Sequence, residues 1–219
     1  MIRSEGPHYL ISRRLVHAVL ATGLLVILLA AGAAYALAEQ WLPAVERALD
    51  VEAPLAASDV VVLRSNSRSQ AAVRAAGRYL LDGGAEAIVL LGRPFSPDDL
   101  APAQESRNVP SLLALGVPRA KIVEIYDLEI DLYDELKALA PQARERGWRR
   151  VLFLLVPGGS RRHLLAARSI LGADGIAVGQ VLFPDDSPEP DPWWRDAQLR
   201  GHVMYNWIEL LFGRLAGRY

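Results

Sequence analysis

One stretch of the sequence combines residue types that bind anions where a strand turns into a helix. Residues 151–171 read VLFLLVPGGSRRHLLAARSIL, an apolar run broken by Pro-Gly-Gly and followed by a serine, two arginines and a helical pattern. Glycines leave backbone N–H groups unobstructed at a helix start, where those donors and the helix dipole attract an anion. Arginine adds charge-assisted hydrogen bonds to phosphate or carboxylate. The candidate ligand-binding residues here are Gly158, Gly159, Ser160, Arg161, Arg162 and His163.

A second polar loop follows an earlier apolar run. The run DVVVLRS, residues 59–65, precedes the polar segment NSRSQ. The candidate ligand-binding residues of this loop are Arg64, Ser65 and Arg68. Because ligands of an open parallel sheet bind outside the carboxyl ends of its strands, the two loops are expected to line one crevice. The alternative is that Ser160, and Ser67 or Ser69, only cap helices while the arginines are solvated or paired with acids.

Carboxylates cluster in a third loop, DLEIDLYDE at residues 127–135. Asp131 and Glu135 share a helix face and could hold a hard cation or act as acid and base. A solvated first helical turn that suits the helix dipole is the alternative. Glu135 is the candidate catalytic residue, as a general acid or base. No metal site is expected, because the four histidines are dispersed and no H-x-x-x-H pair occurs.

Familiar catalytic and nucleotide-binding signatures are missing from these loops. There is no G-x-G-x-x-G after the first apolar run, no Walker lysine and no G-x-S-x-G elbow, so the sequence predicts no particular cofactor. Ser160 and His163 lie three residues apart on one helix, but no orienting acid accompanies them. The formal net charge of −1 argues against nucleic-acid binding, and the absence of cysteine excludes disulfides and thiolate chemistry.

An N-terminal segment is long and apolar enough to cross a membrane. Residues 15–38 are 24 residues without a formal charge, and as a helix they span roughly 36 Å against a hydrocarbon core of roughly 30 Å. Arg13 and Arg14 precede them, so the N-terminus is expected in the cytoplasm and residues 39–219 outside the plasma membrane. A signal peptide cleaved at AYA (34–36) and a buried core helix are the alternatives, but a signal h-region is usually shorter.

Short apolar runs alternate with helical patterns through the rest of the chain. The expected strands are 59–65, 87–92, 121–127, 150–156 and 176–184. This alternation predicts an α/β fold with a Rossmann-like, doubly wound, mostly parallel sheet, preceded by one transmembrane helix. The expected organisation is a cytoplasmic N-terminus (1–14), a transmembrane helix (15–38), a linker (39–57) and an extracytoplasmic α/β domain (58–219). One face of the expected terminal helix carries Leu199, Val203, Trp207 and Leu210.

A series of short segments between about residues 57 and 215 carries a family resemblance. In chain order they are DVVVLRS, Arg68, YLLDGG, AIVLLG, Glu105, LALGVPRAKI, DLYDEL, LVPGGSRRHL, WW and NWIELLFGRL. In this order and spacing they resemble the SanA/ElyC/YdcF-like family, or domain of unknown function 218, with LGVPRAKI as the most specific match. The resemblance implies a Rossmann-like fold, often behind a membrane anchor. It also implies a role in the bacterial envelope, in barrier integrity or in cell-wall and surface-polysaccharide biogenesis.

The chain departs from the family at several pocket positions. Arg64-Ser65 stands where the family has Gly-Gly, Ser160 aligns with its histidine and His163 with its arginine, whereas Glu135 keeps its acid. S-adenosylmethionine binding, suggested for one cytoplasmic branch, is therefore not carried over. The leading hypothesis is a membrane-anchored envelope protein that binds an anionic ligand or partner, such as a lipid-linked sugar phosphate. The alternatives are a transferase or hydrolase acting on such a precursor, and a non-catalytic protein-interaction module.

Overall fold

The computed structural model describes residues 13–65, 67, 69–92, 106, 108–126, 132–184 and 192–218. The chain divides into two compact units, Met1–Ala44 and Val45–Tyr219. The first unit contains helix α1 (Arg13–Ala36), rich in leucine and alanine, which are strong helix formers. Its segment Val16–Ala36 is long and apolar enough to cross a membrane, in agreement with the sequence. Helix α2 (Ala38–Arg47) follows and ends within the second unit.

Among the described residues, five parallel strands form the sheet of the second unit. They are β1 (Val60–Arg64), β2 (Ala87–Leu91), β3 (Ile122–Ile125), β4 (Arg150–Leu155) and β5 (Ala177–Leu182), in the order β3-β2-β1-β4-β5. Each predicted strand contains one of them, and every neighbouring pair is parallel. The predicted doubly wound α/β fold is confirmed.

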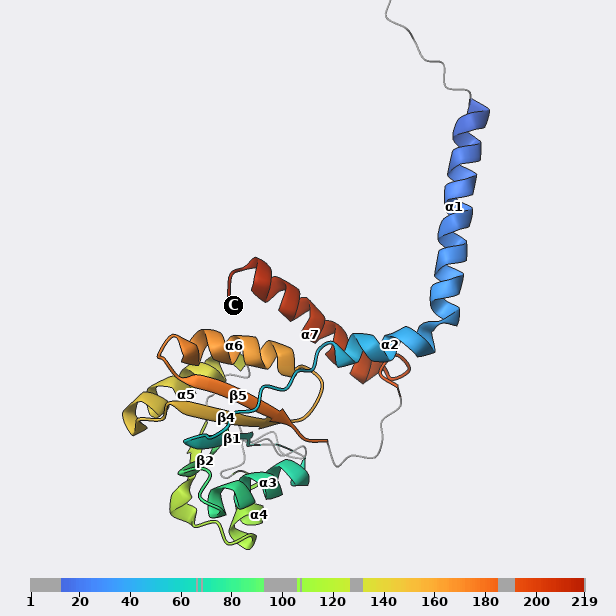
Figure 1. Cartoon of the computed structure of the whole chain (residues 1–219). Coiled ribbons are helices and arrows are strands. Elements are labelled where there is room, and N and C mark those ends of the chain that lie inside the picture. The colour runs from blue at the N-terminus through green and yellow to red at the C-terminus, as the bar shows by residue number, and fades with distance from the viewer. Residues whose placement is uncertain are drawn as a thin grey trace, which may run out of the picture. The chain divides into compact units, whose positions relative to one another are not determined.

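Helices cover both faces of this sheet (Figure 1). On one face lie α3 (Gln70–Leu81) and α4 (Asn108–Ala114), and on the other lie α5 (Leu132–Arg146) and α6 (Ser160–Gly172). Side chains alternate along each strand, so Val61 and Leu63 of β1 pack toward α3 while Val60 and Val62 pack toward α5 and α6. Two apolar layers therefore cover both faces of the sheet, as a parallel sheet requires.

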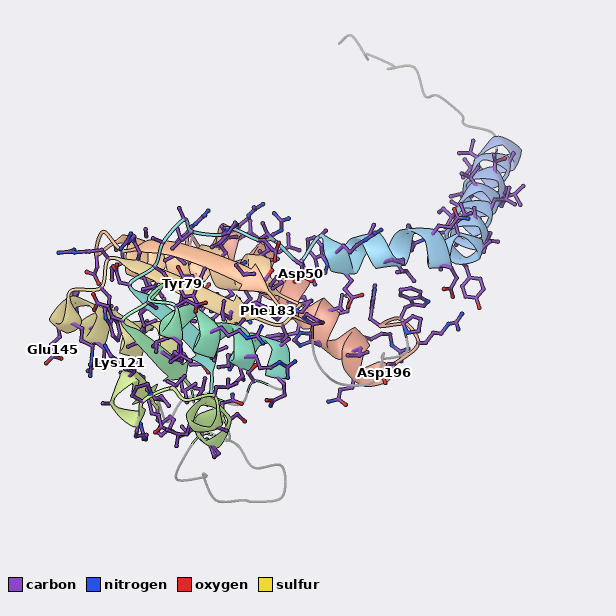
Figure 2. All side chains as sticks on the ribbon, turned by 60° about the horizontal axis from the view of Figure 1, so that its bottom comes forward. Asp50, Tyr79, Lys121, Glu145, Phe183 and Asp196 are labelled. Atoms are coloured by element: carbon purple, nitrogen blue, oxygen red, sulfur yellow. The ribbon has the colours of Figure 1, made fainter. Side chains whose placement is uncertain are left out.

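Shorter elements complete the second unit. A 3₁₀ turn, η1 (Arg119–Lys121), leads into β3. The last helix, α7 (Ala197–Leu215), begins at Asp196, whose side chain accepts a hydrogen bond of 2.8 Å from the Leu199 N–H (Figure 2). Of the helix face predicted from the sequence, Val203 and Leu210 are buried, and Leu199 and Trp207 are partly buried.

Part of the segment expected to be a linker packs as part of the second unit. Leu49 is fully buried. Ala53 exchanges two backbone hydrogen bonds with Gln180 of β5, its N–H at 3.0 Å from the Gln180 oxygen and its oxygen at 2.9 Å from the Gln180 N–H. We call residues 48–55 the docked linker. It pairs with the outer edge of β5, an edge that otherwise exposes unpaired backbone groups.

Gly179 of β5 provides a test of this packing. A Cβ atom at Gly179 would lie 2.5 Å from Leu55 Cγ and 2.7 Å from the Ala53 carbonyl oxygen. We expect Gly179→Ala to displace the docked linker and to lower the free energy of unfolding by about 1–3 kcal/mol. Gly172→Ala is the matched control, since a Cβ at Gly172 of α6 meets open space. Urea unfolding of the full chain in detergent, followed by tryptophan fluorescence, measures both; equal stabilities would show that the linker does not pack there.

Candidate functional site

The strand order of the sheet reverses between β1 and β4, which are neighbours. Ligands of doubly wound sheets bind outside the carboxyl ends of the strands at such a switch point. The loops that leave β1 and β4 here begin after Arg64 and after Leu155. These are the two loops that the sequence predicts to line one crevice.

The turn after β4 binds a carboxylate that belongs to the chain itself. Gly158 and Gly159 adopt positive φ angles of 107° and 145°, a conformation that glycine tolerates without steric cost. Their N–H groups donate to Asp50 of the docked linker, at 2.8 Å and 3.1 Å from Oδ1, and the Ser160 N–H lies 3.4 Å from the same oxygen. Asp50 lies just beyond the end of α2 (Figure 2). The anion-binding geometry predicted from the sequence is present, and Asp50 occupies it.

Ser160 and Gln180 hold the next residue of the docked linker. The Ser160 hydroxyl accepts a hydrogen bond from the Val51 N–H at 2.8 Å and lies 3.1 Å from the Val51 carbonyl oxygen. The Gln180 amide donates to the Val51 and Ser160 carbonyl oxygens, at 2.6 Å and 3.0 Å. The N-cap of α6 is Gly159, without a side-chain cap, so the alternative in which Ser160 caps the helix is wrong. Ser160 binds the linker instead.

The two arginines of the opening stretch also have internal partners. The Arg161 N–H donates to the Leu49 oxygen at 2.9 Å, and Arg161 Nε donates to the Ala48 oxygen at 2.7 Å. The Arg162 guanidinium is buried, 3.5 Å from Glu209 Oε2 and 5.2 Å from the centre of the Tyr205 ring. Arg161 therefore binds the docked linker, and Arg162 ties α6 to α7.

Arg64, at the end of β1, is the most exposed of the predicted ligand residues that carry a charge and that the structure describes. Its side chain is 49 % exposed, and Nη2 donates to Glu135 Oε1 at 2.7 Å. Glu135, on the first turn of α5, is only 4 % exposed. It packs against Gly92, where a Cβ would lie 2.6 Å from Glu135 Oε1. Glu135 thus holds the Arg64 guanidinium, while about half of the Arg64 side chain remains exposed.

His163 is a buried histidine near this switch point, and its pKa is lowered. It is buried beside Phe153, with ring centroids 4.5 Å apart in an edge-to-face arrangement. Burial lowers the pKa of His163 to about 3, and the positive charge of Arg64 contributes to that lowering more than the charge of Arg162 does. The adjacent Gln180 side chain offsets part of the effect. His163 is therefore neutral near pH 7.

Two serines beside the first loop, Ser65 and Ser69, have structural roles. The buried Ser65 hydroxyl donates to the Gly92 oxygen at 2.5 Å, and Asn108 Nδ2 donates to the Ser65 oxygen at 3.3 Å. Ser69 caps α3 by accepting from the Ala72 N–H at 3.1 Å, as the capping alternative predicts. Arg68, Glu105 and Asp131 lie outside the described residues.

Sequence reasoning missed two of the residues that organise the site. Asp50 lies in a segment expected to be a plain linker, although the alternation Leu49, Val51, Ala53 and Leu55 is typical of a chain packed on one side. Gln180 interrupts the apolar run AVGQVL, and a lone amide in a buried strand requires hydrogen-bond partners. Both signals are visible in the sequence once they are sought.

Comparisons of the chain with protein-family models, with curated proteins and with solved structures find no significant match. Within the described residues, no group of three or more His, Asp or Glu side chains could hold a metal ion.

The hydrogen bonds of Asp50 with the start of α6 are expected to stabilise the folded chain. Asp50→Asn preserves the shape of the side chain but removes the charge that the three N–H donors and the helix dipole stabilise. We expect the free energy of unfolding to fall by about 1–2 kcal/mol. Asp174→Asn, which removes a surface ion pair with Arg144 at 3.1 Å, is the control and should cost less than about 1 kcal/mol. Equal losses in urea unfolding of the full chain would contradict the special role of Asp50.

The lowered pKa of His163 predicts how the free energy of unfolding depends on pH. The unfolded chain binds a proton at this residue below a pKa of about 6.5, whereas the folded chain does so only near pH 3. The contribution of His163 to stability is therefore lost as pH falls, by about 2 kcal/mol between pH 7 and pH 5. His163→Gln should lessen the pH dependence by this amount. Val61→Ala, in the opposite core layer, should lower stability equally at both pH values; the same slope in wild type and His163→Gln would refute the assignment.

Proposed function

We propose that this chain is a bacterial envelope protein of the SanA/YdcF-like type, anchored in the plasma membrane by one helix. Its α/β domain binds an anionic ligand or partner at the carboxyl edge of the sheet. The observation that supports this most is the exposed guanidinium of Arg64 at the β1–β4 switch point, held by buried Glu135.

The geometry around Arg64 favours binding of an anion over acid–base chemistry. Glu135 is committed to the Arg64 guanidinium at 2.7 Å, and a carboxylate paired in this way positions the arginine rather than exchanging protons with a substrate. An arginine oriented by a buried partner loses less side-chain freedom when it binds a planar anion. Arg64 is thus preorganised for phosphate or carboxylate.

The surrounding charges point the same way. Arg64 and Arg162 both lie close enough to buried His163 for their charges to oppose its protonation, although burial opposes it more. The positive charge of Arg64 therefore favours an anion at this edge of the sheet.

The N-terminal segment supports the choice of ligand class. The apolar segment Val16–Ala36 is preceded by Arg13 and Arg14, which under the positive-inside rule keep the N-terminus in the cytoplasm and the domain outside. A domain tethered to the outer face of the membrane meets lipid-linked sugar phosphates at the bilayer surface. Such a precursor is the ligand we favour, in barrier maintenance or in cell-wall and polysaccharide biogenesis.

A comparison of two arginines at opposite edges of the sheet tests this proposal. Arg150 has the same 49 % side-chain exposure as Arg64 and also pairs with a carboxylate, Asp59, but it begins β4 at the amino edge. The full chain in detergent is screened by thermal shift with sugar nucleotides, a polyprenyl phosphate analogue, S-adenosylmethionine and inorganic phosphate. A ligand at about 100 times its Kd stabilises by about 2.7 kcal/mol.

We expect Arg64→Lys to weaken binding of the best ligand about tenfold, since lysine keeps the charge but loses the planar fork. Arg150→Lys should leave the affinity unchanged. A shift that survives in Arg64→Lys would place the ligand elsewhere. No shift with any anion would overturn the binding function and favour a protein-interaction module.

A further inference from the structure

Helix α7 presents apolar side chains on two opposite faces. One face is buried against the domain through Val203, Asn206, Leu210 and Gly213. The other face points to solvent and carries large apolar side chains with exposed fractions between 47 % and 85 %. They are Met204, Tyr205, Ile208, Leu211, Phe212 and Leu215.

The exposed set follows the period of the helix. Positions 204, 208, 211 and 215 are separated by four, three and four residues, and 205 and 212 flank them, so the six side chains form one stripe. No charged residue of α7 falls on this stripe, because Arg200, Glu209 and Arg214 lie on its flanks. A surface helix ordinarily places charged residues opposite its buried face, and an uninterrupted apolar stripe of this size marks an interaction surface.

We infer that this stripe of α7 docks on the surface of the lipid bilayer in which the N-terminal helix is anchored. This inference rests on the membrane anchoring in the proposed function, and it adds a second contact between the domain and the membrane. An amphipathic helix in this position lies in the interface plane with its apolar side chains among the upper acyl chains.

The covalent connection keeps α7 within reach of the bilayer. Trp207 Nε1, at the middle of α7, donates to the Val45 carbonyl oxygen at 3.3 Å. Val45 is the ninth residue after Ala36, where the apolar segment ends. Nine residues extend at most about 32 Å, so α7 cannot leave the neighbourhood of a membrane that holds the first helix.

The residues at the flanks of the stripe suit a bilayer better than a second protein chain. Arg200 and Arg214 of α7 are exposed cations at the flank of the stripe. Glu209, the single carboxylate between Ala197 and Arg218, lies 3.5 Å from Arg162 and so does not present an unpaired negative charge. Cations beside an apolar stripe favour anionic headgroups. Tyr205, whose ring also lies 5.2 Å from Arg162 Cζ, is half exposed and adds an aromatic ring at the edge of the stripe.

The absence of cysteine in the chain allows a direct test. Single-cysteine variants of the full chain carry an environment-sensitive fluorophore and are reconstituted, one copy per disc, in phosphatidylcholine–phosphatidylglycerol nanodiscs. The positions are Ile208→Cys on the stripe, Leu25→Cys in the apolar N-terminal segment and Glu145→Cys. Glu145 is exposed at the end of α5, far from the start of α7 (Figure 2). Brominated lipids then report which labels contact acyl chains.

We expect the label at position 208 to shift its emission to the blue and to lose about half of its intensity to brominated lipid. The label at 25 should be quenched at least as strongly, and the label at 145 should not respond. Quenching at 25 but not at 208 would overturn the docking while leaving the anchor intact. Quenching at neither position would overturn the anchor itself and the docking with it.

A second copy of the chain is the competing occupant of the stripe. In that case label 208 would not be quenched by lipid in single-copy discs. It would show energy transfer between copies when two differently labelled chains share a larger disc. That result would overturn membrane docking in favour of dimerisation through α7.

Discussion

The contact between the Asp50 carboxylate and the start of α6 connects parts of the molecule that the sheet alone does not hold. The Pro-Gly-Gly turn after β4 leaves N–H groups without helical acceptors, and a buried helix end without partners is costly. Asp50 supplies the acceptor. Val51 and Ala53 then meet Ser160 and the edge of β5. On the other side of the turn, the Gly158 carbonyl oxygen accepts from Asn206 of α7 at 2.9 Å. One turn therefore joins the docked linker, the edge strand and the last helix.

The backbone geometry of an anion site and the availability of that site to a ligand are two different properties. The sequence GGSRR has the geometry of an anion site, and the structure fills that geometry from within, with Asp50 and the two arginines all engaged in internal contacts. Arg64 has no motif around it. It is half exposed, it lies at the switch point, and the buried Glu135 holds its guanidinium. A sequence motif therefore indicates what a turn of the backbone can bind. The burial of its side chains and their internal hydrogen bonds decide whether those groups are accessible to a ligand.

The sequence predicted the sheet better than the site for a physical reason. Strands such as VVVLR and AIVLL are continuous apolar runs because both faces are buried, so their character is local and visible in a window of a few residues. The pairing of Asp50 with Gly158 joins residues 108 apart, and that of Arg64 with Glu135 joins residues 71 apart. Such contacts depend on strand order, which the alternation of elements leaves open. His163 shows the same limit, since its charge state follows from burial and from Arg64 rather than from its neighbours in the chain.

Helix α7 carries apolar side chains on its exposed face as well as on its buried face. The sequence predicts one packed face of α7, formed by Leu199, Val203, Trp207 and Leu210. A helix on the surface of a soluble domain needs only one apolar face. The remaining apolar positions are spaced so regularly on the opposite side that composition alone does not explain them. Helix α7 is tied to Val45, only nine residues beyond the apolar segment Val16–Ala36. If that segment spans a bilayer, this short connection keeps the stripe of α7 within reach of the headgroups.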